Sequence, residues 1–177
     1  MHDPQRSLFQ GERRSNAARK GISMRIVAFC ALVALALVGC AVQPSLTGKY
    51  TVLSISTTDA GAAAKIISAY RVSKGLSPVT VDHTLNKAAE HQARTVAAAG
   101  ALSHGDFNGR MKEFGIMGYA AENLTAGSST VDAAVVRWKN SPPHNDNLLM
   151  PQARKIGLAR ADANGAYNHY WALVLGQ

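Results

Sequence analysis

Cysteine is scarce in this sequence, which has only two, Cys30 and Cys40. So few cysteines exclude a scaffold held by several disulfides and a cysteine-rich zinc module. The chain also lacks the strings His-Glu-x-x-His, Gly-x-Ser-x-Gly and Gly-Lys-Ser/Thr, which mark common zinc-protease, serine-hydrolase and phosphate-loop sites. The sequence contains no repeat of fixed period, which argues against a solenoid. Stability must therefore come from packing, and any chemistry from residues distant in the sequence.

Charged residues are also few, at 17% of the chain, whereas 47% of its 177 residues are hydrophobic. This is enough apolar material for a packed domain of ordinary size plus an extra segment. The net charge at pH 7 is +8, but much of the basic excess lies in residues 1–39. The rest has no run of lysine and arginine interleaved with aromatic residues, and nucleic-acid binding by counterion release needs clustered cations. We therefore expect no nucleic-acid partner.

The N-terminal part has the pattern of an export signal. A positive start at Met24 and Arg25 precedes an apolar run over 26–38, which is too short to span a membrane comfortably. The run ends in Leu-Val-Gly-Cys at Cys40 and resembles the bacterial lipobox, in which the cysteine is lipidated. Residues 24–40 are thus predicted to be a lipoprotein signal peptide, although a buried helix ending at Gly39 is the alternative. Residues 1–23 are interpreted as a gene-model extension or a long n-region.

A lipidated Cys40 predicts export and a membrane anchor in the bacterial cell envelope. Ala41 follows the cysteine where an aspartate commonly retains lipoproteins at the inner membrane, so a two-membrane bacterium would place the protein at its outer membrane. Removal of Cys30 with the signal would leave no free thiol, which excludes a cysteine nucleophile. We expect residues 41–58 to be a tether with a short extended piece at 50–55, and residues 59–177 to form the domain.

The periodicity of 59–177 changes from helical to extended. Helical spacing begins after Asp59 and again after Asp82, and glycines end both runs. Shorter helices are expected over 109–114, from Thr130 to 140, and just after Ser141. The segments 155–159 and 167–175 read as strands joined by an Asn-Gly turn, and 119–124 as a third strand. This order predicts an α+β fold with α-β-α layers.

Three short strings carry the functional signal: Ser103-His104, Ala121-Glu122-Asn123 and Ser141-Pro142-Pro143-His144. In order and spacing they are similar to the CAP superfamily of cysteine-rich secretory, antigen 5 and plant pathogenesis-related proteins, above all its compact bacterial branch. The likeness extends over residues 62–177 and includes further residues of the pattern, namely Arg71, Leu85, Arg110, Trp138, Asn147 and Trp171. It implies a three-layer α-β-α sandwich with an open cleft.

The resemblance also implies which residues form the cleft. His104 and His144 match the two histidines of the family and Glu122 its first acid, but Ser141 stands where the second acid is expected; Asp106, Glu113 or Asp146 would have to replace it. Two imidazoles and one carboxylate would suit Zn²⁺ or another divalent metal.

Each of these residues also has a structural alternative. His104 could cap a loop, Glu122 could pair with a histidine, and His144 could be structural; Asn123 is interpreted as a strut that bonds to backbone. A neutral His144 is favoured because the helix dipole opposes a cation in the first turn. Arg110 is expected to pair with Glu113.

Three functions are compatible with this pattern. The first is a binding module, an anchored monomer that presents its cleft to a lipid, a glycan or an envelope protein. The second is a metal-dependent hydrolase acting on peptides, which is weakened because no general base for the water is evident. The third is a structural envelope lipoprotein with a vestigial cleft. No residue is assigned a catalytic role.

Overall fold

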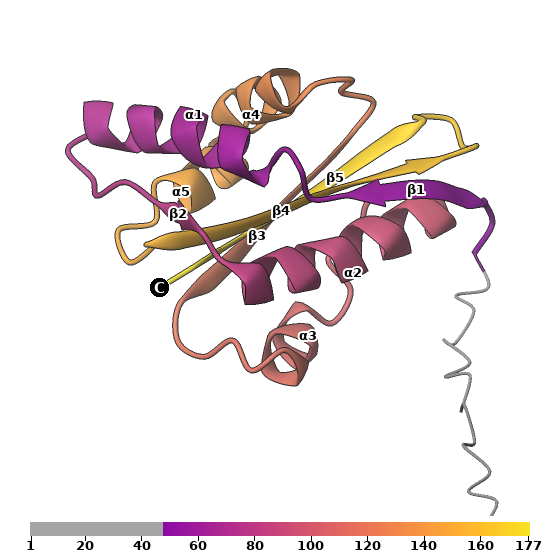
Figure 1. Ribbon diagram of the computed structural model, residues 1–177, viewed down its shortest axis with the longest axis horizontal. Coiled ribbons are helices and arrows are strands. Elements are labelled where there is room, and N and C mark those ends of the chain that lie inside the picture. Colours follow the sequence, from indigo (N-terminus) through magenta and orange to yellow (C-terminus); the bar gives the residue numbers. More distant parts are fainter. Residues whose placement is uncertain (1–47) are drawn as a thin grey trace, which may run out of the picture. The chain divides into compact units, whose positions relative to one another are not determined.

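The computed structural model describes residues 48–177 (Figure 1). The expected signal peptide, Cys40 and residues 41–47 of the tether lie outside the described residues. Within 48–177, no helix is both long enough and apolar enough to cross a membrane. All of the helices and strands below belong to this part of the chain.

One mixed sheet forms the centre of the domain. Its strands lie in the order β1-β4-β5-β3, and the short β2 pairs with β4 beside β1. Every pairing is antiparallel except that of β2 with β4. The strands are β1 (Val52–Ser56), β2 (Thr80–Val81), β3 (Ala120–Ala126), β4 (Lys155–Ala163) and β5 (His169–Gly176). Because β3 is at the end of this order, residues on it border an open edge of the sheet.

Helices cover both faces of the sheet, which confirms the α-β-α sandwich (Figure 1). One face carries α2 (His83–Ala99) and α3 (Phe107–Glu113), and the other carries α1 (Ala60–Ser73), α4 (Val131–Lys139) and α5 (Pro142–Leu148). The side chains of each face form a separate core cluster. Both clusters lie within 48–177, so this part of the chain has the core that it needs to fold by itself.

Strand alternation explains why the two faces pack differently. On β4 and β5, bulky side chains such as Ile156, Leu158 and Trp171 point toward α1 and α4. Small side chains, including Ala159, Ala161 and Ala172, point toward α2. The facing stripe of α2 is small as well, and its members are Ala88, Ala89, Ala93 and Ala97. Small residues on both sides let α2 approach the sheet closely.

The closest approach is at Gly157, which the sequence did not single out for packing. A Cβ atom there would lie 2.0 Å from the backbone carbon of Leu85 and 2.2 Å from the nitrogen of Asn86. Next to it, the side-chain oxygen of Asn86 accepts a hydrogen bond from the Leu158 N–H at 2.9 Å. Helix α2 thus supplies an acceptor for the Leu158 N–H of β4. This N–H lies between the part of β4 that pairs with β2 and the part that pairs with β1.

Gly157→Ala is therefore expected to destabilise the domain by about 1–3 kcal/mol, since backbone rather than a flexible side chain must move. Chemical denaturation followed by circular dichroism measures this. Gly61→Ala is the matched control, because nothing lies within 4 Å of a Cβ at Gly61 on α1. That variant should be neutral or more stable by about 0.4–1 kcal/mol. Equal stability of the two variants would contradict the close-approach argument.

Three helix ends follow the sequence pattern. Asp82 accepts hydrogen bonds from the N–H groups of Thr84 and Leu85, and Thr130 from that of Ala133, as expected of N-caps. Gly100 ends α2 in the left-handed conformation, with φ 68°. Asp59 precedes α1 as predicted but makes no side-chain capping bond, because its own backbone is already helical.

Two expectations about the strands need correction. The first strand of the hairpin was expected to end at 159, but β4 continues to Ala163, and Asn164 and Gly165 begin the loop that runs from 164 to 168. Asp162 instead lies in the ladder opposite His169, whose ring nitrogen is 2.8 Å from its carboxylate, so side-chain pairing extends the hairpin. The end of the 41–58 tether is also part of the domain: Val52–Ser56 forms β1, which pairs with β4. The sequence of an edge strand such as β1 does not show which strand will supply its backbone hydrogen bonds.

Candidate functional site

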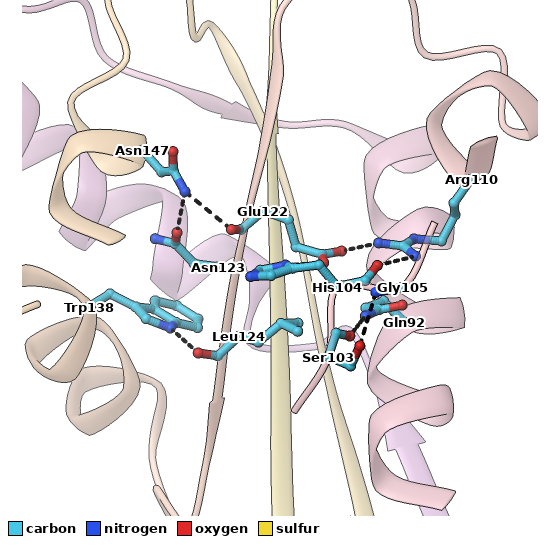
Figure 2. A network of polar contacts seen from close by, with 10 residues as sticks. All are labelled: Gln92, Ser103, His104, Gly105, Arg110, Glu122, Asn123, Leu124, Trp138 and Asn147. Carbon is cyan, nitrogen blue, oxygen red and sulfur yellow. Dashed lines mark hydrogen bonds and ion pairs between the residues drawn. The ribbon is translucent and has the colours of Figure 1, made fainter. Parts of the chain in front are cut away.

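The candidate residues converge at the open edge of β3. Glu122 and Asn123 are neighbours on this strand, so their side chains point to opposite faces of the sheet. Glu122 meets the loop and helix on the α2 side, where His104 lies (Figure 2). Asn123 meets α5, where His144 lies. The strand edge therefore brings the two histidine segments together from opposite layers.

A buried ion pair underlies the first histidine. Nη2 of Arg110 lies 2.6 Å from Oε2 of Glu122, and both side chains are almost fully buried. Oε1 of the same carboxylate is 2.8 Å from Nδ1 of His104, and the Arg110 Nη1 also donates to the backbone oxygen of His104 at 3.2 Å (Figure 2). The expected pairing of Arg110 with Glu113 is wrong, because the guanidinium turns inward toward β3.

This arrangement defines the orientation of the His104 ring. Glu122 forms an ion pair with Arg110, and a carboxylate in an ion pair can only accept hydrogen bonds. The proton of the neutral imidazole then sits on Nδ1, which leaves the Nε2 lone pair available. The His104 side chain is 54% exposed while the Glu122 side chain is 1% exposed. A buried carboxylate thus orients an exposed ring at the edge of the sheet.

The second histidine is held by its own helix and by β3. The Nδ1 atom of His144 is 2.8 Å from Oγ of Ser141, three residues before it in the chain. Asn123 donates from Nδ2 to the His144 backbone oxygen at 2.9 Å, as expected of a strut. Burial lowers the pKa of His144 below its ordinary value, and the nearby His104 charge lowers the pKa further. His144 is therefore neutral at neutral pH.

The shift has a measurable consequence for pH dependence. Because the pKa of folded His144 is depressed, protonation favours the unfolded chain, and this contribution to stability is lost as the pH falls below about 6.5. NMR titration should give His144 a pKa below the ordinary histidine value of 6.5. In His104→Ala the pKa of His144 should rise part of the way, since burial remains. A His144 pKa at or above this ordinary value would contradict the geometry.

Ser141 occupies the position of the missing second acid but does not replace its charge. The two residues that follow it, Pro142 and Pro143, have no N–H that could donate to an oxyanion. None of the acids considered as substitutes bonds to either histidine in the described part of the chain. Asp106 caps α3 through the Gly109 N–H, and Glu113 and Asp146 are exposed. The site therefore has one buried carboxylate.

The family resemblance implied a Zn²⁺ site formed by His104, Glu122 and His144. Both oxygens of Glu122 already accept hydrogen bonds, from His104 and Arg110. No group of three histidine, cysteine, aspartate or glutamate side chains among residues 48–177 is arranged to hold a metal ion. The three residues in this arrangement do not fit a three-ligand metal site, and metal binding stays a prediction.

Three supporting residues were not recognised as such from the sequence. Arg110 was expected to pair with Glu113 on the same helix. Its core-facing position was the available signal that its partner is buried. Gln92 of α2 donates to the backbone oxygen of Ser103 at 2.6 Å and so holds the loop that carries His104. Asn147 of α5 donates to the backbone oxygen of Glu122 and to the side chain of Asn123 (Figure 2). For Gln92, the visible sign in the sequence was a glutamine inside the otherwise apolar stripe of α2.

Comparison with known sequences finds a family match over most of the described domain. Residues 65–175 match the profile of the cysteine-rich secretory protein family, CAP. The uncharacterized protein YkwD of Bacillus subtilis is 29% identical over 109 residues, which are 58% of this chain and 42% of that protein. The chain thus spans less than half the length of this relative.

Solved structures show the same fold. An outer surface protein of Borrelia burgdorferi matches with a TM-score of 0.61 and 22% identity, over 73% of this chain and 98% of that one. An extracellular protein of Bacillus anthracis that contains an SCP domain matches with a TM-score of 0.57 and 21% identity, over 66% and 39%. At these identities the structural likeness concerns the fold.

Proposed function

Since the chain belongs to the cysteine-rich secretory protein (CAP) family, we propose that it is an exported binding domain whose ligand occupies the cleft at His104, Glu122 and His144. The domain would be held at the cell envelope through a lipid on Cys40. The names of the two structural neighbours describe an outer surface protein and an extracellular protein, which supports export of this chain. The lipobox-like string before Cys40 supports the anchor.

The observation that carries the proposal is the buried ion pair behind an exposed imidazole. Burying Arg110 and Glu122 is expensive in solvation, and apolar residues of similar size often give equal or greater stability. Holding the exposed His104 ring in one orientation adds little to packing, because more than half of its side chain is exposed. A ligand that contacts His104 Nε2 gains from such preorganisation, since less freedom is lost on binding.

The cleft chemistry indicates what kind of ligand fits. The lone pair of His104 accepts a hydrogen bond from an N–H or O–H group, and His144 is a second neutral ring nearby. Glycans and peptides offer such donors, whereas an acyl chain does not. The single carboxylate is already paired with Arg110, so the geometry supports binding rather than hydrolysis.

NMR titration of a soluble chain with residues 41–177 tests the cleft. A fragment library rich in sugars and amides should give ¹H–¹⁵N shifts that cluster around His104, Glu122 and His144. His104→Ala should abolish these shifts, whereas the control His83→Ala, at an exposed position of α2, should not. A library without any hits at this edge of the sheet would favour the structural alternative with a vestigial cleft.

The anchor is tested separately in the full chain. Expressed in a bacterium that processes lipoproteins, the protein should partition into the detergent phase and yield a mature form that begins at a lipidated Cys40. Cys40→Ser should move it to the aqueous phase, and the control Cys30→Ser should not. Detergent partitioning that survives Cys40→Ser would rule out this anchor while leaving the cleft proposal untouched.

A further inference from the structure

The first described residues are held at one end of the central sheet. The Tyr50 N–H donates to the Ala98 oxygen near the end of α2 at 2.9 Å. Thr51 and Asn164 exchange two hydrogen bonds, of 2.9 and 3.2 Å, at the loop between β4 and β5. The start of β1, the end of α2 and the β4–β5 loop therefore meet at this end of the domain (Figure 1).

The ring of Tyr50 fills the space between these segments. It lies against two glycines, because a Cβ atom would be 2.1 Å from the ring at Gly100 and 3.2 Å from it at Gly165. The ring thus fastens the start of β1 to both α2 and the β4–β5 loop. A tether that precedes Gly48 consequently joins the domain at this end.

Large hydrophobic side chains are exposed at the same end. Leu53 of β1 is 67% exposed, Tyr167 of the β4–β5 loop is 53% exposed, and Leu102, just beyond α2, is 47% exposed. Lys49 is exposed beside them, and its Nζ lies 5.2 Å from the centre of the Tyr50 ring. These residues are called the tip surface below, and its members are Lys49, Tyr50, Leu53, Leu102 and Tyr167.

The tip surface carries no negative charge of its own. Aspartate and glutamate do not occur in the segments that form it, which are 48–53, 98–102 and 163–168. Asp162, which precedes the last of these segments, is paired with Arg160 and His169. Tyrosine has an apolar ring with a polar tip, and lysine keeps its charge in water while its stem lies on apolar surface. This combination is typical of surfaces at the boundary between a membrane and water.

The short chain before the tip surface limits its distance from a membrane. With a lipid on Cys40, residues 41–48 extend at most roughly 28 Å, which is close to the diameter of a small domain. Such a short linker gives the tip surface an effective concentration of about a millimolar at the bilayer. A contact too weak to hold a free domain on a membrane is then enough for an anchored one.

We therefore propose that the tip surface docks on the lipid bilayer that holds the anchor. Its leucines and tyrosines enter the headgroup boundary, and Lys49 pairs with lipid phosphates. The inference rests on the lipid at Cys40 proposed above, but not on a ligand in the cleft.

Docking at this end keeps the cleft clear of the bilayer. On β3, Ala126 lies opposite Tyr170, near the tip, whereas Glu122 lies opposite Val174. Tyr170 and Val174 are roughly 14 Å apart along β5, since a strand rises about 3.4 Å per residue. A ligand thus reaches the cleft from the aqueous side while the domain rests on the membrane.

Paramagnetic lipids test the docking whether or not a cell lipidates Cys40. Residues 40–177 are coupled through the Cys40 thiol to a maleimide lipid, in nanodiscs of phosphatidylethanolamine and phosphatidylglycerol that contain a gadolinium-chelating lipid. Amide signals of 48–53, 98–102 and 164–168 should lose most of their intensity. Signals of α5 and of Glu122 should keep most of theirs, because paramagnetic broadening falls steeply with distance.

An even loss across the domain, or a loss centred on another face, would overturn the proposal and leave the tip surface to a protein or a cell-wall glycan. Detergent partitioning of the full chain judges the anchor, and the paramagnetic measurement judges the docking, so that each can fail alone.

Matched variants locate the contact. Combining Leu53→Ser, Leu102→Ser and Tyr167→Ser should abolish the selective loss of signal, since the domain then moves freely on its tether. The control pair Val72→Ser and Met117→Ser replaces side chains that are 57% and 75% exposed outside the tip surface, and it should leave the pattern unchanged. A ¹H–¹⁵N spectrum of each variant without nanodiscs shows whether the fold persists. A selective loss that survives in the folded triple variant would refute the proposal.

Discussion

Replacing Arg71 by methionine is expected to lower the free energy of unfolding by about 3–5 kcal/mol. Arg71 is completely buried on α1 and has no acidic partner among the described residues. Its guanidinium instead donates to four backbone oxygens at 2.7–3.0 Å, those of Ser77, Leu148, Met150 and Ala153. Methionine fills much of the volume but leaves these acceptors without a donor.

The effect should be large because one side chain connects three segments. The turn after α1, the end of α5 and the loop into β4 all present carbonyl groups to Arg71. Each buried acceptor that loses its donor costs about 1–3 kcal/mol, although part of this is recovered when the loops relax toward water. The expected fall in melting temperature is roughly 10–20 °C.

Urea denaturation of residues 41–177 measures this change, and Arg71→Lys refines it. Lysine has three donors at a single nitrogen and cannot reproduce the fork, so an intermediate loss is expected. The matched control is Arg94→Met on α2, where an exposed ion pair with Glu90 at 3.5 Å should contribute less than about 1 kcal/mol. Similar losses for Arg71→Met and Arg94→Met would refute the role assigned to these carbonyl contacts.

Glu122→Ala is the second substitution with a large expected effect, a loss of about 3–5 kcal/mol. It leaves the buried Arg110 guanidinium without its counter-ion and removes the hydrogen bond that orients His104. Glu122→Gln should cost less, because an amide oxygen can still accept one of the two hydrogen bonds. The loss of stability in Glu122→Ala reflects the cost of leaving the Arg110 charge buried and unpaired. It does not measure how much the ion pair itself stabilises the fold.

A double variant separates these two quantities. If Arg110 and Glu122 are both replaced by methionine, no buried charge is left unpaired, and much of the stability should return. The orientation of His104 should not return, and ¹⁵N shifts of its ring would report a mixture of tautomers. Recovery of stability without recovery of ligand binding would support a functional role for the pair. If Glu122→Ala proves as stable as the original protein, the ion pair is not buried as described.

Local sequence patterns predicted most of the secondary structure. The stripe on α2, the cap at Asp82 and the left-handed Gly100 all depend on neighbours within a few residues, which the sequence displays directly. The same holds for Pro142 and Pro143, which place His144 in the first turn of α5. The α-β-α order was predicted from the periodicity and from three short strings that resemble the family, and the family match confirms that resemblance. The cleft that the resemblance implies stays a prediction.

Contacts between distant segments were decided by the tertiary structure. The sequence predicted that Arg110 pairs with Glu113 on the same helix, yet its partner is Glu122 on a different element, because burial at the β3 edge makes the inner carboxylate the nearer one. Nor does any local pattern show that β1 joins the sheet or that α2 needs a glycine at 157.

The amino-acid sequence by itself determined most of the elements, their layering and which residues meet at the edge of β3. Periodicity and capping are properties of consecutive residues, so they can be read along the chain. The tertiary structure alone decided that Glu122 is occupied by two donors and that Arg71 holds backbone carbonyls. Hydrogen bonds and charges act over a few ångströms in space, and only the folded chain brings these groups that close.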